Sequence, residues 1–426
     1  LPDAGGFAAT IGAALQKLIE GTPAPEAPSA PEISESEQWA PVREMQIEGA
    51  ITHIVMTGDQ TQSLWVATEA PALHVFAPDQ ATPLRTISLP EPLQALVPVP
   101  GAVGGVMVVG GGRDDILRAW DANGELLWER PSHVSETFRV GDRWEAPWFT
   151  DPVQKPGILS LMVADVTGTG KPEVVLGRPS TVEYWSLPEG ELLARVPIHW
   201  GDVRELALLH HADGPQVLAG KHVTGNSRAS VLDANREIIT EGAFGGIIAG
   251  ATDMHAWLQR GIGALQVADL DADGAEDVVV AHTGHWNDLR AFSAGGTQVL
   301  WQHSFGAARP SSHFIEDMLV ADIDGDGGCE TVVGMQNGWL VCIEASGEVR
   351  WSRRLSGGVR TIAGLPEGVV VGLADGHVLA VTSAGEPHRA IRLGGAVSAL
   401  TTWPARPDVQ MVLAGGADGR LVVLPR

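Results

Sequence analysis

The sequence predicts an all-β protein, an eight-bladed β-propeller in which similar antiparallel sheets form a closed ring. Two kinds of segment predict it, because both recur along the chain. In one kind an acidic turn joins two apolar strands, and in the other a glycine-containing turn joins them. One segment of each kind gives a repeat of about four strands, the usual content of a propeller blade. The repeat therefore favours a single domain, although 426 residues would be long enough for about two or three.

Three copies of each segment show the repeat most clearly. The acidic turn and its flanking strands occur as LMVADVTGTGKPEVVLG, LQVADLDADGAEDVVVAH and LVADIDGDGGCETVVGM. The other segment occurs as LRAWDANGELLWER, LRAFSAGGTQVLWQ and LVCIEASGEVRWSR, which begin at Leu117, Leu289 and Leu340. A tryptophan recurs within it, at Trp128, Trp301 and Trp351. We expect these three side chains to pack one blade against the next.

The two ends of the chain are predicted to close the ring. Inner strands should begin near Ile51, Leu93, Ile158, Val203, Ile262, Phe314, Val359 and Val397. The last repeat stops after three strands, and VREMQIEGAITHI, from Val42, matches the join between blades that begins at Val349. The N-terminal strand would then be the outer strand of the last blade, which leaves no open sheet edge. This count gives eight blades, with seven as the alternative.

Two acidic turns carry the ligand pattern of a calcium site. DLDADGAED, from Asp269 to Asp277, and DIDGDGGCE, from Asp322 to Glu330, place carboxylates at relative positions 1, 3, 5 and 9. A glycine at position 6 lets the chain curl so that the oxygens converge on one hard cation. The predicted ligands include one backbone carbonyl, at position 7 of the first turn. They are Asp269, Asp271, Asp273, Ala275, Asp277, Asp322, Asp324, Asp326 and Glu330.

A third turn, DVTGTGKPE, is a degenerate copy of the other two. Thr167 and Thr169 replace its second and third carboxylates, so that only the carboxylates of Asp165 and Glu173 remain. With half of the charge, we expect this turn to bind Ca²⁺ weakly or not at all.

These segments resemble two known kinds of repeat. The LxAxDxxGxxLW-like segments resemble the repeats of eight-bladed quinoprotein-type (PQQ-like) propellers, which include non-enzymatic relatives that serve as assembly factors. The Asp-rich turns resemble the FG-GAP or VCBS-type repeats of integrin alpha subunits and many bacterial surface proteins. Together the two resemblances cover Val42 to Arg426. They imply a calcium-binding propeller that interacts with other proteins, although such folds host many activities.

The net charge argues against certain partners, and the expected calcium affinity indicates a location outside the cytosol. A net charge of -24 makes nucleic acid and anionic membrane surfaces poor partners, because phosphate binding needs basic patches. Calcium sites of this kind bind at about 10⁻⁴ to 10⁻³ M in extracellular modules, so we expect a periplasmic, secreted or cell-surface location. The chain starts at Leu1 rather than Met, which fits removal of a leader. It contains no apolar span of about 20 residues that would cross a bilayer.

Two cysteines, Cys329 and Cys342, flank one predicted hairpin. The turn of this hairpin would not place them opposite each other, so we predict two separate thiols. Cys342 takes the position that Ala119 and Ala291 hold in the sister repeats, and we expect it to be buried there.

Residues 1–41 differ in composition from the rest of the chain. Apolar residues at helical spacing predict a short amphipathic helix whose stripe is formed by Phe7, Ile11, Leu15, Leu18 and Ile19. A Pro-rich arm follows to residue 41, and the propeller would occupy residues 42–426. A helix of about 14 residues is marginal alone. The segment is therefore either a fraying terminus or an arm that docks on a partner subunit.

Insertions are predicted on the face opposite the acidic turns. The longest run from His133 to Gly157 and from Gly245 to Gly261. They would gather aromatic and histidine side chains into a ligand pocket or a protein contact. The predicted interaction residues are Trp144, Trp148, Trp200, His222, His255, Trp257, His282, His285 and Trp286. Ordinary packing is the alternative for the tryptophans, and His282 with His285 offers two imidazoles to a transition metal.

The sequence carries few signs of an enzyme. It has no adjacent cysteine pair of the kind found in quinone-dependent dehydrogenases, and no GxSxG, HExxH, P-loop or CxxCH motif. We therefore expect a non-catalytic propeller that presents its loops or its N-terminal arm to another protein or a glycan. The alternative is a secreted carbohydrate-binding protein or polysaccharide-active enzyme, whose first candidate residues would be Arg139, Asp142, Arg143, Glu145 and His255.

Overall fold

The structure is a computed structural model, and it describes residues 38–58, 62–77, 79–132, 157–222, 228–245, 259–284, 287–296, 298–305, 314–406 and 409–426. Within these ranges the chain forms strands β1 to β30 and one 3-10 helix, η2 (Val103–Gly105), with no α-helix. The helix predicted near the N-terminus lies outside the described residues.

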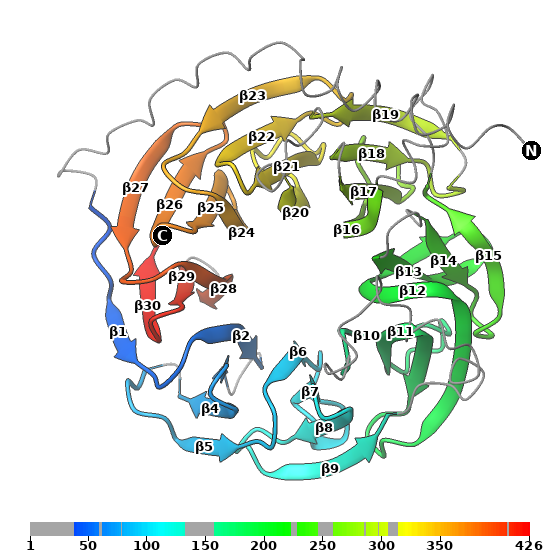
Figure 1. Ribbon diagram of the computed structural model, residues 1–426, viewed down its shortest axis with the longest axis horizontal. Coiled ribbons are helices and arrows are strands. Elements are labelled where there is room, and N and C mark those ends of the chain that lie inside the picture. Colours follow the sequence, from blue (N-terminus) through cyan, green and yellow to red (C-terminus); the bar gives the residue numbers. More distant parts are fainter. Residues whose placement is uncertain are drawn as a thin grey trace, which may run out of the picture.

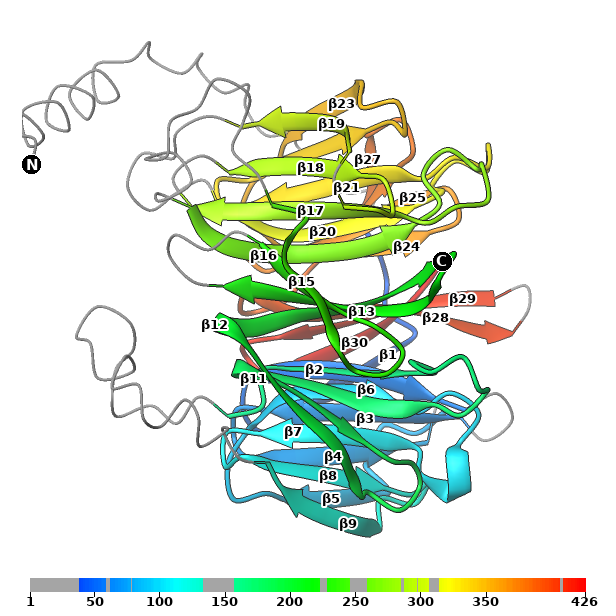
Figure 2. The same cartoon turned by 90° about the vertical axis from the view of Figure 1, so that its right-hand side faces the viewer.

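The sheets stand side by side around a common central axis (Figure 1). Five sheets have four strands each, paired in the orders β2-β3-β4-β5, β6-β7-β8-β9, β20-β21-β22-β23, β24-β25-β26-β27 and β1-β30-β29-β28. A ten-stranded sheet contains β10 to β19. In four of the five four-stranded sheets the strands follow one another in chain order from the centre of the ring to its rim, and in the fifth β28, β29 and β30 are followed by β1 at the rim (Figures 1 and 2). We call such a four-stranded unit a blade and name it by its strands.

The strands of the four-stranded sheets are short. Their bounds are β1 (Arg43–Gln46), β2 (Ile51–Thr57), β3 (Ser63–Thr68), β4 (Ala72–Phe76), β5 (Arg85–Ser88), β6 (Leu93–Pro98), β7 (Val108–Gly112), β8 (Ile116–Trp120), β9 (Leu126–Pro131), β20 (Ile315–Ala321), β21 (Glu330–Met335), β22 (Trp339–Ile343), β23 (Val349–Arg354), β24 (Val359–Leu365), β25 (Gly368–Leu373), β26 (His377–Thr382), β27 (Pro387–Arg392), β28 (Val397–Arg406), β29 (Val409–Gly416) and β30 (Arg420–Pro425).

The ten-stranded sheet arises because two long strands, β11 and β12, each span two successive strand positions of the propeller. Its strands are β10 (Ser160–Ala164), β11 (Glu173–Trp185), β12 (Leu192–His211), β13 (Gly214–His222), β14 (Ala229–Leu232), β15 (Ile238–Ala243), β16 (Gln259–Ala268), β17 (Asp277–Gly284), β18 (Asp288–Phe292) and β19 (Val299–Ser304). The first part of β12 pairs with β11, and its last part pairs with β13. A single bridge from His222 to Gly261 joins β13 to β16.

The chain ends close the ring, as the sequence predicted. β1 pairs antiparallel with β30, with Arg43 opposite Val423 and Gln46 opposite Arg420 (Figure 1). On the other side of this blade, the Ser398 hydroxyl donates to the Ile51 carbonyl over 2.5 Å. The contacts begin even before β1, because the indole of Trp39 is buried and donates to the carbonyl of Pro425 over 2.7 Å.

Glycines in the second strand of a blade let the next blade approach closely. A Cβ added at Gly111 would lie 2.5 Å from Ile158, and one added at Gly415 would lie 2.6 Å from Ile51. Atoms that close would clash, so each glycine makes room for the apolar residue near the start of the next inner strand. The hydrophobic core is therefore divided into clusters that lie between neighbouring blades.

The recurrent tryptophans pack between blades, as the sequence predicted. The indole Nε1 of Trp128 donates to the Pro188 carbonyl in the β10–β12 blade over 2.7 Å. Trp301 and Trp351 make the same bond to the β20–β23 and β24–β27 blades. Cys342 is buried opposite Trp351, as Ala119 is opposite Trp128, and both cysteines are free thiols. The predictions for Cys329 and Cys342 are therefore confirmed.

Candidate functional site

The first acidic turn joins β16 to β17, and backbone hydrogen bonds fix its shape. The Asp269 carboxylate accepts the N–H groups of Asp273 and Gly274 over 3.1 and 2.9 Å. Gly274 has a φ of 90°, which favours glycine at the tightest point of the turn. Asp269, Asp271 and Asp273 each place one carboxylate oxygen within 4.8 Å of the others. Three of the predicted ligands are therefore brought together.

Asp277 stands at the start of β17, where the turn returns to the sheet. Its carboxyl is nearly buried, and this burial raises its pKa to about 6, against the effect of a hydrogen bond from Leu270. The negative charges of Asp271, Asp273 and Asp269 raise that pKa further. Among the described residues, no basic side chain forms an ion pair with any of these four carboxylates. The first turn is thus a concentration of negative charge that lacks a counter-ion from the described part of the chain.

The second acidic turn joins β20 to β21 and has the same backbone frame. Asp322 accepts the N–H groups of Gly325 and Gly327 over 2.6 and 3.0 Å, and the bond from Gly325 helps to hold its pKa below the usual value. Asp322, Asp324 and Glu330 place oxygens within 4.8 Å of one another. The predicted ligand Asp326 is not part of this group, and its carboxylate accepts the N–H of Gly328 over 2.9 Å.

An arginine reaches into the second turn. Arg350, on the outer strand β23, lies 2.6 Å from the Asp324 carboxylate and 3.8 Å from that of Glu330. Glu330 is 1% exposed, and burial raises its pKa to about 7, while Arg350 lowers it. The guanidinium therefore supplies part of the positive charge that a metal ion would otherwise supply.

The third turn keeps the frame of the other two with only two of the four carboxylates. Asp165 accepts the N–H groups of Thr169 and Gly170 over 3.1 and 2.5 Å, while the hydroxyls of Thr167 and Thr169 bond to each other over 2.8 Å. The remaining carboxylate, on Glu173, pairs with Arg236 over 2.6 Å. In this turn the arginine pairs with one of the two carboxylates that could have helped to hold a cation.

Most of the predicted interaction face lies outside the described residues. This applies to Trp144, Trp148, His255, Trp257, His285 and Trp286, and to the candidate enzyme residues Arg139, Asp142, Arg143 and Glu145. Trp200 lies in β12, where only its backbone is described. His222 ends β13 and is half-buried.

The prediction that His282 belongs to an exposed interaction face is wrong. Its side chain is fully buried in β17, with Nε2 3.1 Å from the Phe244 carbonyl. Sequence reasoning placed it on a turn, but it pairs with Ile262 inside the sheet. Its contacts are those of a core residue.

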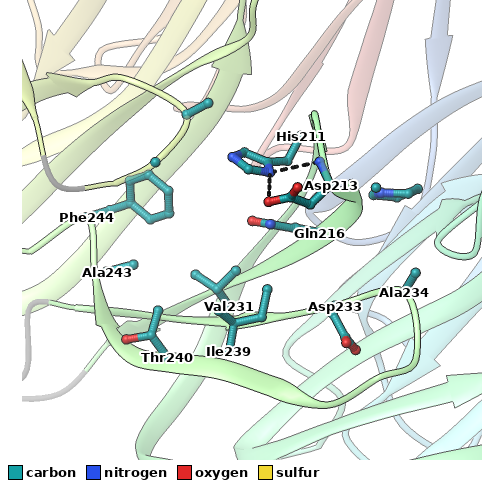
Figure 3. Close-up of a pocket in the computed structure, with 14 residues that line it drawn as sticks. His211, Asp213, Gln216, Val231, Asp233, Ala234, Ile239, Thr240, Ala243 and Phe244 are labelled. Atoms are coloured by element: carbon teal, nitrogen blue, oxygen red, sulfur yellow. Dashed lines mark hydrogen bonds and ion pairs between the residues drawn. The ribbon is translucent and has the colours of Figure 1, made fainter.

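A pocket of about 390 Å³, which the sequence did not predict, opens between the β12–β15 and β16–β19 blades (Figure 3). His211, Asp213 and Gln216 line one side, and Val231 and Ile239 line the other. The Asp213 carboxylate lies 3.4 Å from Nδ1 of His211, and its side chain is 89% exposed. The volume of the pocket falls within the usual range for ligand pockets.

Comparison with known proteins identifies the fold. No family model and no curated protein matches the chain. Its structure is similar to Sqt1 of Saccharomyces cerevisiae (11% identity, TM-score 0.67, 91% of this chain and 99% of that one). It is also similar to the computationally designed protein Ika8 (17%, TM-score 0.61, 90% and 99%) and to BamB from Moraxella catarrhalis (15%, TM-score 0.61, 91% and 100%). The chain is a β-propeller.

These likenesses, all at low identity, show the fold alone. The propeller frame places the acidic turns on one face of the ring, because each of them follows the first strand of its blade. Within the described residues, no helix has the length and hydrophobicity needed to cross a membrane.

Proposed function

We propose that this propeller is a non-catalytic interaction or assembly subunit that works outside the cytoplasm and is stabilised by Ca²⁺. The proposal that Ca²⁺ binds rests on the geometry of the first acidic turn. There, Asp269, Asp271 and Asp273 converge, and within the described ranges no arginine or lysine balances them. Hard carboxylate oxygens at this spacing are the ligands that Ca²⁺ prefers.

The three turns form a series that supports this assignment. The first turn has converging carboxylates and no arginine partner in the described residues, the second shares its carboxylates with Arg350, and the third pairs Glu173 with Arg236. The negative charge of each turn thus favours a nearby cation, which can be a metal ion or the guanidinium of an arginine. We assign the tightest calcium site to Asp269, Asp271, Asp273 and Asp277, a weaker one to Asp322, Asp324 and Glu330, and none to the third turn. Bound Ca²⁺ would neutralise the carboxylates and fix the turns.

The location outside the cytoplasm follows from the calcium assignment. Modules with sites of this type bind at about 10⁻⁴ to 10⁻³ M, a concentration reached outside the cytosol. We further propose eight blades, because the ten-stranded sheet divides into β10–β12, β12–β15 and β16–β19, which join the five four-stranded sheets. We also propose that the repeats are of the quinoprotein-like and FG-GAP-like kinds that their sequences resemble.

Calcium binding can be tested with a matched pair of variants. Chelator-stripped protein should bind Ca²⁺ in calorimetry, and 10 mM Ca²⁺ should raise the free energy of unfolding by about 1.4 to 2.7 kcal/mol per site. Asp269→Asn should remove the tighter site. Asp165→Asn changes the equivalent residue of the third turn and should leave calcium binding unchanged. Equal heats for both variants, or no heat for the parent protein, would refute the assignment.

The interaction role has a separate test. Immobilised protein should retain a specific protein from extracts of its source, and retention should fall when Ca²⁺ is chelated because the turns lose their order. Turnover of a polysaccharide in a panel of substrates would instead show that the protein is an enzyme.

A further inference from the structure

The junction between the β24–β27 blade and the closing blade of β28, β29, β30 and β1 takes its tryptophan from the N-terminal segment. At the preceding junction, Trp351 packs with the third strands of its two blades, β22 and β26. Trp39 packs in the same way with β26 and β30. Its indole donates to the Pro425 carbonyl over 2.7 Å, and the indole of Trp351 donates to the Ser383 carbonyl over 2.8 Å. Trp39 therefore serves as the packing tryptophan of this junction.

Arg389 stands where the β24–β27 blade would carry its own tryptophan. Ala380 is paired with Arg389, as Cys342 is paired with Trp351 in the blade before it. Arg389 is half-buried, and no carboxylate of the described residues forms an ion pair with it. Its strand, β27, carries a second arginine and no acidic residue, and β23 carries three arginines and no acidic residue. These two outer strands are thus basic in a chain whose net charge is -24.

The N-terminal segment reaches β27 before it reaches β1. β27 is the last strand of its sheet, and β27 and β1 follow one another along the rim of the ring (Figure 1). Gln38 forms a parallel bridge with Ala390, and the N–H of Trp39 donates to the Ala390 carbonyl over 2.6 Å. This register sets Trp39 opposite Ile391, and Ile391 packs against the cluster that contains Trp39. The outer edge of β27 therefore pairs with the chain at Gln38.

The residues that precede Gln38 have the charge and composition to continue this pairing. They lie outside the described residues. Residues 20–37 contain five glutamates and no aspartate, lysine or arginine. The last six, EISESE from residue 32 to residue 37, also contain no proline, so each can donate a backbone N–H to a neighbouring strand. An acidic segment and a basic strand have complementary charges, which favours their association.

We propose that residues 32–37 bind to the outer edge of β27 as a continuation of the strand that the bridge begins. In the register of this bridge, Glu37 lies opposite Arg389. Alternate residues of a strand share one face, so Glu37 is on the face of Trp39. Arg389 is likewise on the face of Ile391, which packs with Trp39. The carboxylate of Glu37 therefore pairs with the guanidinium of Arg389.

The occupant of this edge is the chain itself, because Trp39 already holds the segment beside its site. Tethering makes the contact intramolecular, so it needs no free concentration of a partner. Gln38 directly follows the proposed strand, which leaves no loop to close. The added strand joins the β24–β27 blade to the closing blade, in addition to the pairing of β1 with β30. It goes beyond the proposed function, since neither Ca²⁺ nor a second protein takes part.

Hydrogen exchange of the full chain, followed by mass spectrometry, tests the added strand. At low salt the backbone amides of residues 33–37 should exchange at least about tenfold more slowly than in an unstructured chain. Arg389→Glu sets two like charges opposite each other and should reduce this protection by about fivefold. Glu37→Arg should have the same effect, and the double variant should restore the protection to within about twofold. The control is Arg113→Glu, which makes the same change of charge at an exposed arginine between β7 and β8 and should leave the protection unchanged.

Three results would overturn the proposal: exchange of residues 33–37 at the unstructured rate in the parent protein, unchanged protection in Arg389→Glu, or a double variant that fails to restore it. Circular dichroism shows whether each variant is folded, and the double variant decides the pairing whatever the stability of the single variants. Protection that disappears on about hundredfold dilution would show that the segment of a second copy is the occupant, and the proposal would again be wrong. None of these results bears on calcium binding or on partner capture, so the proposed function fails or survives by its own tests.

Discussion

The β20–β23 and β12–β15 blades have the same strand order but differ at three corresponding places. The outer strand carries Trp351 in the first and Thr240 in the second. The turn after the inner strand is a nine-residue acidic turn in the first and a short hairpin in the second. The inner strand carries Asp317 in the first and Glu205 in the second. The comparison teaches that the same structural position can hold a buried packing side chain in one blade and an exposed side chain in another.

The largest expected difference lies at the outer strand. Trp351→Ala should lower the free energy of unfolding by about 3 to 5 kcal/mol, because it removes a buried ring and an inter-blade hydrogen bond. Thr240→Ala should change it by less than about 0.5 kcal/mol, because Thr240 is exposed. Urea denaturation in excess Ca²⁺ measures both. Similar losses would mean that the junction beside Thr240 is as tightly packed as the regular one, and the comparison would fail.

The acidic turn of the β20–β23 blade should respond to loss of its arginine. In Arg350→Gln the carboxylates of Asp324 and Glu330 lose their internal cation, so the calcium affinity of this turn should rise by about tenfold, or about 1.4 kcal/mol. The control is Arg353→Gln, because Arg353 lies on the same strand but pairs with exposed Glu386. Calorimetry of both variants is the measurement. Weaker binding in Arg350→Gln would show that the arginine helps to build the site.

The inner strands should give the two blades different pH dependence. Burial raises the pKa of Glu205 to about 8, with a further contribution from Asp317, and burial raises the pKa of Asp317 to about 6. A carboxyl with a raised pKa binds its proton more tightly in the folded state. Its contribution to stability is therefore complete below the unfolded pKa and is lost as pH rises through the folded value.

Stability should accordingly fall from about pH 4 to pH 6 through Asp317 and continue to fall to about pH 8 through Glu205, with a slope of at most about 1.4 kcal/mol per pH unit for each group. Glu205→Gln keeps an acceptor for the Leu265 N–H and should abolish the fall between pH 7 and 8, which lies above the pKa of about 7 of another raised carboxyl, Glu330. Asp317→Asn should flatten only the lower range. Denaturation curves at fixed salt and pH 4 to 9 decide the matter, and an unchanged profile in Glu205→Gln would contradict the assignment.

Much of this architecture can be read from local sequence. Strand order, the shared frame of the acidic turns and the place of Trp128, Trp301 and Trp351 follow from patterns that recur within a few residues. Ring closure by the segment from Val42 follows from a repeat that is one strand short. Such features are predictable because a strand, a tight turn and its glycine depend mainly on neighbours in the chain.

Other features depend on contacts between distant segments. The sequence alone determined a ring of similar blades with three acidic turns. Only the tertiary structure decided that Arg350 and Arg236 enter two of those turns, that His282 is buried, and that a pocket remains beside Thr240. The physical reason is that charge balance, burial and packing are set by atoms that meet across strands and across blades, and a repeat pattern fixes the positions of the strands without fixing which side chains meet between them.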